Sequence, residues 1–159
     1  MLAIKPHHFV DLITALGQGQ LPAEPHPYGH ALHLVAQKLV ADRDVVLRIE
    51  LGADDICAPC RHNIGGRCDD VIDTSFRPTA PSSKREWNLL LDERWCERLG
   101  IQQGDVITAR QLCQRLRERA GDITPIYREI PAARTAERQR NLERGIERFL
   151  ERPLCPPTP

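Results

Sequence analysis

Apolar side chains recur every three or four residues over five stretches of the chain, and this spacing predicts amphipathic helices. Pro6 suits the first turn of a helix and Gly17 its end, so the first helix is expected between these two residues. Thr108 is an expected N-cap, and Asp92 is a possible cap further upstream. The five helices are expected over residues 6–17, 30–41, 87–99, 109–120 and 132–151.

One stretch has the composition of a β-strand instead. Residues 45–51 begin with two valines and end with alternating polar and apolar positions, and Gly52 closes the run. The predicted fold class is therefore α+β and mainly helical, with about five helices and a short strand that leads into a cysteine-containing loop. We expect one domain over residues 1–152, followed by a proline-rich tail over residues 153–159.

Composition narrows the range of partners. The chain has 159 residues with 22 basic and 22 acidic side chains, so it has no net charge that would attract nucleic acid or a membrane surface. No apolar run approaches the roughly 18 residues that a membrane span needs, and the first residues do not resemble a signal peptide. A cytoplasmic location is expected, without nucleic acid or membrane as a partner.

Three of the six cysteines lie within twelve residues, and they are the strongest chemical signal in the chain. Cys57 and Cys60 form a C-x2-C pair, and Cys68 follows after a Gly65-Gly66 dipeptide that can reverse the backbone. In a reducing compartment, clustered thiols are more typical of metal ligands than of disulfides. The spacing predicts a three-thiolate site for a metal ion or an iron–sulfur cluster.

Three thiolates leave a tetrahedral ion or a four-iron cluster one ligand short. Asp11 and Cys96 are the preferred candidates for the fourth position, and His8 and His62 are further ones.

Histidines are concentrated near the start of the first two predicted helices. Each one alone fits a capping or surface role, but together they suggest a polar pocket beside the thiols that could support acid–base chemistry. The candidate catalytic residues of this pocket are His7, His8, His30 and His33.

The same residues carry a resemblance to a known family. The motifs are Lys-Pro-His-His at residues 5–8, Gly-Gln-Gly at 17–19, Asp-Asp-Ile-Cys-x2-Cys at 54–60 with Cys68, and a segment over residues 91–106. Over residues 4–120 the chain resembles a small prokaryotic family of unknown function that is usually described as iron–sulfur binding. The resemblance implies that Cys57, Cys60 and Cys68 are ligands and that the first helix packs against their loop. Members often have a cysteine where this chain has Asp11, and many have a further C-terminal cysteine group that is absent here.

Three functions are compatible with these residues. The first is a cytosolic iron–sulfur protein, with a 4Fe-4S cluster favoured, that serves a redox partner or acts as a Lewis acid on a small-molecule substrate. The second is a zinc-stabilised module that binds another protein. The third is a cysteine nucleophile or redox thiol. The residues leave open which applies and whether the protein is an enzyme.

Overall fold

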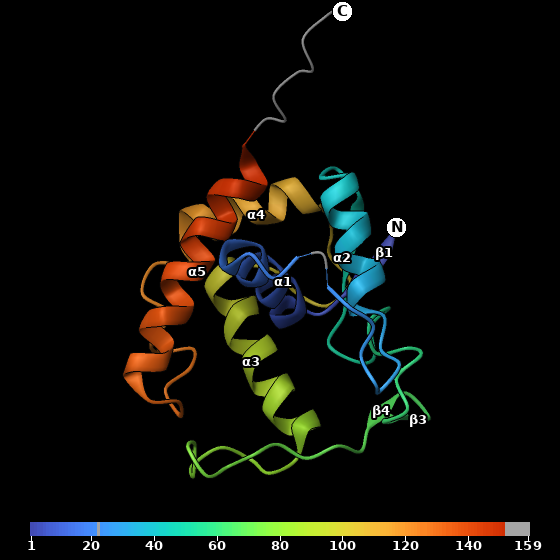
Figure 1. Ribbon diagram of the computed structural model, residues 1–159, viewed down its shortest axis with the longest axis vertical. Coiled ribbons are helices and arrows are strands. Elements are labelled where there is room, and N and C mark those ends of the chain that lie inside the picture. The colour runs from blue at the N-terminus through green and yellow to red at the C-terminus, as the bar shows by residue number, and fades with distance from the viewer. Residues whose placement is uncertain (22, 152–159) are drawn as a thin grey trace, which may run out of the picture.

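A computed structural model describes residues 1–21 and 23–151, so the predicted tail over residues 153–159 lies outside the described part. The described residues contain five helices and two small sheets, which confirms the predicted mainly helical α+β class (Figure 1). The helices are α1 (Pro6–Gln18), α2 (Leu32–Ala41), α3 (Lys84–Leu99), α4 (Ala109–Arg119) and α5 (Ala132–Leu150). The strands are β1 (Leu2–Ile4), β2 (Val46–Ile49), β3 (Asn63–Ile64), β4 (Arg67–Cys68) and β5 (Val106–Thr108).

A three-stranded sheet fixes where the first helix begins. β2 is the central strand, with β1 parallel on one side and β5 antiparallel on the other. Ile4 pairs with Ile49, and both side chains are fully buried. Only Lys5 separates β1 from α1, so the start of α1 lies at the end of β2, where the cysteine loop begins. Of these strands only β2 was expected from the sequence, and it is shorter than predicted.

Two glycines allow α1 and α5 to cross closely, with α1 near the centre of the molecule (Figure 1). A Cβ atom on Gly17 would collide with the backbone of Asn141, and one on Gly145 would collide with the backbone of Ile13. The predicted helix end at Gly17 is therefore wrong. Gly17 lies inside α1, and the helix ends at Gln18, followed by the C-cap Gly19 with a left-handed φ of 76°.

The predicted starts of the other helices agree with the structure at α4 and differ from it at α2 and α3. Thr108 caps α4 as predicted, and Gln111 completes a capping box with it. α2 begins at Leu32 rather than at residue 30, so His30 precedes the helix. α3 begins at Lys84, where Ser83 accepts a hydrogen bond from the Glu86 backbone. Asp92 is not a cap, because it lies in the middle of α3.

No helix among the described residues has the length and apolar character that crossing a membrane requires.

Candidate metal centre

The cysteine loop folds back on itself through a turn and a hairpin. The Cys60 amide donates to the Cys57 carbonyl at 2.9 Å, which closes the C-x2-C turn. β3 and β4 then pair in antiparallel fashion, with the residue pair Asn63 and Cys68 in register. Gly65 and Gly66, the two loop residues, have φ of 58° and 82°, as a two-residue hairpin requires. The glycine pair thus returns Cys68 toward the C-x2-C turn, as the sequence predicted.

The three cysteines line a single cavity of about 350 Å³. All three are free and half-buried. The cavity lining contains three basic side chains and no carboxylate. The other lining residues are Lys5, Leu51, Gly52, Ala53, His62, Asn63, Gly66, Arg67, Arg85 and Leu89.

The sulfur atoms are spread around this cavity rather than gathered at one point. Sulfurs bound to one tetrahedral zinc ion at about 2.3 Å stand roughly 3.8 Å apart. Among the described residues, the side chains whose donor atoms all lie within 4.8 Å of one another are instead His8, Asp54 and Cys57. The sulfurs of Cys57, Cys60 and Cys68 do not form such a set, so in the described structure they do not all lie within 4.8 Å of one another.

Asp54 joins the start of α1 to the cysteine loop. Its carboxylate accepts hydrogen bonds from the Lys5 amide at 2.8 Å, the Cys57 amide at 2.9 Å and His8 Nδ1 at 2.7 Å. The residue is 1% exposed, and burial alone would raise its pKa. The hydrogen bonds and charge of His8, with the two amides, outweigh burial and hold the pKa of Asp54 well below its usual range. Asp54 is therefore an ionised link between Lys5, His8 and Cys57.

His8 is prepared to act as a neutral ligand beside Cys57. Because a carboxylate only accepts, the 2.7 Å contact assigns the proton to Nδ1 of His8. Burial lowers the pKa of His8, and neighbouring His7 lowers it further, against the opposing effect of Asp54. The ring is thus neutral near pH 7, with the lone pair on Nε2. A carboxylate behind an imidazole in this way is typical of metal-bound histidines.

His62, like His8, has a carboxylate at its Nδ1 atom. Unlike His8, it lines the cysteine cavity. Its Nδ1 lies 2.8 Å from Asp69 Oδ1, while its Nε2 is buried and has no hydrogen-bond partner among the described residues. A buried nitrogen without a partner is costly unless something binds it. His62 is therefore a lining residue of the cysteine cavity, and its Nε2 has no partner among the described residues.

Lys5 provides a buried positive charge at the same cavity. The residue is 6% exposed, and no carboxylate oxygen of the described residues lies within 4.0 Å of its ammonium group. Buried charges are normally paired, so the Lys5 ammonium group would stabilise an anionic group that entered this cavity.

Two of the free thiols, those of Cys57 and Cys96, are poor nucleophiles in this structure. Burial, reinforced by the Asp54 carboxylate, raises the pKa of Cys57 to about 11. Burial likewise raises the pKa of Cys96 to about 11, with Asp92 adding to the shift. An activated cysteine has a lowered pKa instead, so a catalytic nucleophile at Cys57 or Cys96 is not favoured.

Neither of the preferred fourth ligands lines the cysteine cavity. Asp11 forms an ion pair with Arg138 of α5 at 2.7 Å and lines a different cavity. Cys96 is half-buried on α3, where it packs against the hydrophobic core. Tertiary contacts thus engage both side chains outside the cysteine cavity.

The four histidines of the predicted pocket do not line the cysteine cavity, although they lie near the cysteine loop. His7 is buried, and both its amide and its Nδ1 contact Asp92 Oδ1 at 2.8 Å. His30 stacks on His26 with ring centroids 4.4 Å apart, and burial lowers the pKa of His30. His33 lies on α2, and its Nδ1 is buried without a partner among the described residues.

No local pattern singled out Tyr28, which connects the loop before α2 to the cysteine loop. Its ring lies 4.5 Å from that of His62, and Arg61 lies over it at 4.4 Å. The Tyr28 carbonyl accepts from the Arg61 amide at 2.8 Å. The Pro-Tyr-Gly context suggested only a loop, so no local signal identified this contact.

Comparison with family models, curated proteins and solved structures gives no match to this chain, so function rests on the geometry of the site.

Proposed function

We propose that the protein binds an iron–sulfur cluster through Cys57, Cys60 and Cys68. The observation that carries the proposal is that these three free cysteines line one cavity whose walls contain three basic side chains and no carboxylate. Thiolates and a bound cluster are anionic, so Lys5, Arg67 and Arg85 would stabilise them electrostatically. Residues 5–8 and 54–60 resemble those of the small prokaryotic family that is usually described as iron–sulfur binding, and this resemblance supports the same assignment.

His62 is the proposed fourth ligand. It is the histidine that shares the cavity with the cysteines, its Nε2 has no partner among the described residues, and Asp69 fixes its orientation. Nitrogen can replace sulfur as a cluster ligand. A cluster with four protein ligands has no open iron, so electron transfer to a redox partner is favoured over Lewis-acid chemistry. Because such thiols persist in reducing compartments, the cytoplasm is the expected location.

Metal analysis of anaerobically purified protein tests the proposal. We expect a coloured protein that contains iron and acid-labile sulfide. Cys57→Ser, Cys60→Ser and Cys68→Ser should each lose most of the iron and sulfide. Cys96→Ser is the matched control, because Cys96 is also half-buried but lies outside the cavity, and its iron content should equal that of the wild type.

Electron paramagnetic resonance of the reduced protein tests His62. Nitrogen coupling to the cluster should be present in the wild type and absent in His62→Ala, while His33→Ala should retain it. A colourless protein without sulfide would reject the cluster. An unchanged nitrogen signal in His62→Ala would reject His62 as the ligand.

A structural zinc site is the alternative, and the His62–Asp69 pair favours it. Three cysteines and one carboxylate-backed histidine form a common zinc donor set. The spread of the three sulfurs argues against it, since one ion would require them to converge. One zinc per chain without sulfide would establish this alternative.

A further inference from the structure

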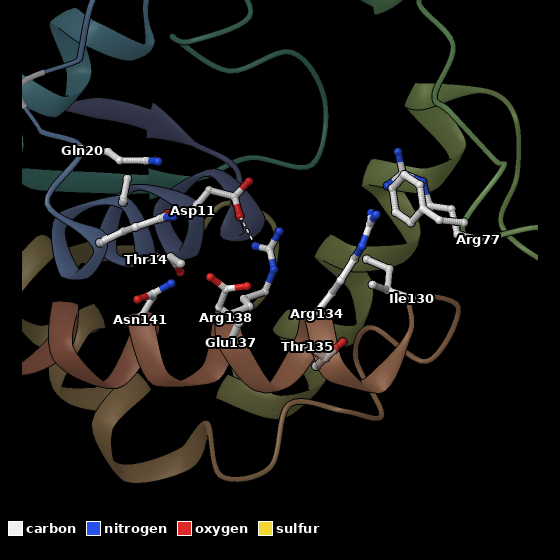
Figure 2. A pocket seen from close by; sticks show the side chains of 13 residues that line it. Asp11, Thr14, Gln20, Arg77, Ile130, Arg134, Thr135, Glu137, Arg138 and Asn141 are labelled. Carbon is white, nitrogen blue, oxygen red and sulfur yellow. Dashed lines mark hydrogen bonds and ion pairs between the residues drawn. The ribbon is translucent and has the colours of Figure 1, made fainter.

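A second cavity, of about 430 Å³, lies between α1, α5 and the connector that precedes α3 (Figure 2). No residue lines both this cavity and the cysteine cavity. Three arginines and two carboxylates face it. They are Arg77, Arg134, Arg138, Asp11 and Glu137.

Within the described part of the chain, only one of these arginines has a carboxylate partner. Arg138 donates to Asp11 at 2.7 Å, as Figure 2 shows. Arg77 and Arg134 have no carboxylate oxygen within 4.0 Å. Burial lowers the pKa of Arg77, and the charges of Arg134 and Arg138 lower it further, against the effect of Asp73. The cavity thus has an excess of positive charge.

The two unpaired guanidinium groups are held in place by one aromatic ring. Arg134 lies 4.1 Å and Arg77 4.8 Å from the centre of the Phe76 ring. Such cation–π contacts orient a guanidinium group without using its N–H donors. Arg77 Nε donates to the Asp73 carbonyl at 2.8 Å, so its terminal nitrogens remain available. Two oriented donor groups therefore face the same space.

A buried hydroxyl on the cavity wall gives an independent indication of a polar ligand. Thr135 is 2% exposed and lines the cavity, yet its Oγ1 has no hydrogen-bond partner among the described residues. Buried hydroxyls are almost always paired, so Thr135 offers an unused hydrogen-bonding group at the wall of this cavity.

We propose that this cavity binds a small organic anion, with its phosphate or carboxylate group between Arg77 and Arg134 and its polar body beside Thr135. The cavity has the size of a small-molecule site. Guanidinium groups match both phosphate and carboxylate with paired hydrogen bonds, which a single lysine does not. The site is separate from the metal centre, and it does not depend on which metal is bound there.

Isothermal titration calorimetry of the full chain tests the proposal, with glycerol phosphate, succinate and inorganic phosphate as probes. We expect one saturable site per chain, and the tighter of the two organic probes identifies the anionic group. Arg134→Ala should weaken binding about tenfold or more, because it removes charged hydrogen bonds. Asp11→Asn should tighten binding, because it removes a competing negative charge and releases Arg138.

Arg140→Ala is the matched control. Arg140 lies exposed on the same helix, does not line the cavity and has the same charge. If Arg140→Ala weakens binding as much as Arg134→Ala, the effect is a general one of net charge and the site is rejected. Absence of saturable binding for all three probes also rejects it. Iron or zinc content should be unchanged in Arg134→Ala, which separates this test from that of the metal centre.

Discussion

At the scale of single residues, two adjacent carboxylates explain how the cysteine loop is attached to the rest of the molecule. Asp54 binds the Lys5 amide, the Cys57 amide and His8. Asp55 accepts from the Ala3 amide at 3.0 Å, and its own amide donates to the Ala3 carbonyl. The pair thus fixes the junction of β1 and α1 against a loop about fifty residues away in sequence. The position of Cys57 depends on these contacts.

Replacing Asp54 with asparagine should therefore lower stability substantially. The asparagine side chain has an NH₂ group where Asp54 has an accepting oxygen, so this group would meet one of the donors of Lys5, Cys57 or His8. The buried hydrogen bonds to a charged carboxylate would also be lost. We expect the free energy of unfolding in urea to fall by about 2–4 kcal/mol.

Asp44→Asn is the control for this change. Asp44 is exposed, and it contacts Arg110 at the surface. Its replacement should leave the urea midpoint unchanged. Equal effects of the two replacements would contradict the role given to Asp54.

At the scale of elements, the crossing of α1 and α5 determines the shape of the helical part. Gly17 and Gly145 bring the two backbones together, and Arg148 of α5 donates to the Leu16 carbonyl at 2.8 Å near the end of α1. The anion cavity lies along the same pair of helices, beyond this crossing. The crossing therefore positions Asp11 and Arg138 against each other.

Gly145→Ala tests the close contact of α1 and α5, because here alanine should lower the free energy of unfolding rather than raise it. Alanine normally stabilises a helix interior by about 1 kcal/mol relative to glycine. Here the added methyl group would meet backbone atoms of α1, which cannot move independently. We expect a net loss of about 2–3 kcal/mol in the free energy of unfolding.

Ala133→Gly on an exposed part of the same helix is the converse control. It should destabilise only through helix propensity, by roughly 1 kcal/mol or less. A stabilised Gly145→Ala variant would show that the two helices are not in close contact.

At the scale of the whole molecule, a largely buried ion pair connects α3 to the segment before α5. Both guanidinium nitrogens of Arg94 bind the Glu129 carboxylate, at 2.7 and 2.8 Å, and Arg94 also donates to the Ile126 carbonyl. The hydrogen bonds from Arg94 hold the pKa of Glu129 below its usual value, although burial opposes them. Stability should therefore depend on the ionisation of Glu129.

The direction of this pH dependence follows from the lowered pKa. The contribution of Glu129 is fully present above the ordinary glutamate pKa of about 4.3, and it is lost as the pH falls toward the lower pKa of the folded protein. Glu129→Gln should be less stable at pH 7 and should lose less stability between about pH 5 and pH 3. Denaturation curves at several pH values measure this. The exposed Glu118→Gln should follow the wild type at each pH.

Local features of the sequence were enough to predict the helices and the hairpin that returns Cys68 toward the C-x2-C turn. Helical periodicity, the Thr108 cap and the Gly65-Gly66 turn each depend on residues a few positions apart. For this reason the five helices, the α4 start and the return of Cys68 could be predicted without the fold. The predicted helix end at Gly17 and the predicted cap at Asp92 were wrong because distant contacts override the local preference. Gly17 packs against the backbone of Asn141, and Asp92 binds His7.

The surroundings of the cysteines were decided only by the tertiary structure. Nothing local shows that Lys5 lines the cavity of the thiols or that Arg138 pairs with Asp11. Nor does it show that His62 Nε2 has no partner within residues 1–21 and 23–151. Arg77 lies in the connector before α3 and Arg134 lies in α5, about sixty residues away, and in its own segment each resembles ordinary surface charge. The sequence alone thus determined which thiols are available, because their spacing is local. The fold determined which charges and donors face them, because those contacts join distant parts of the chain.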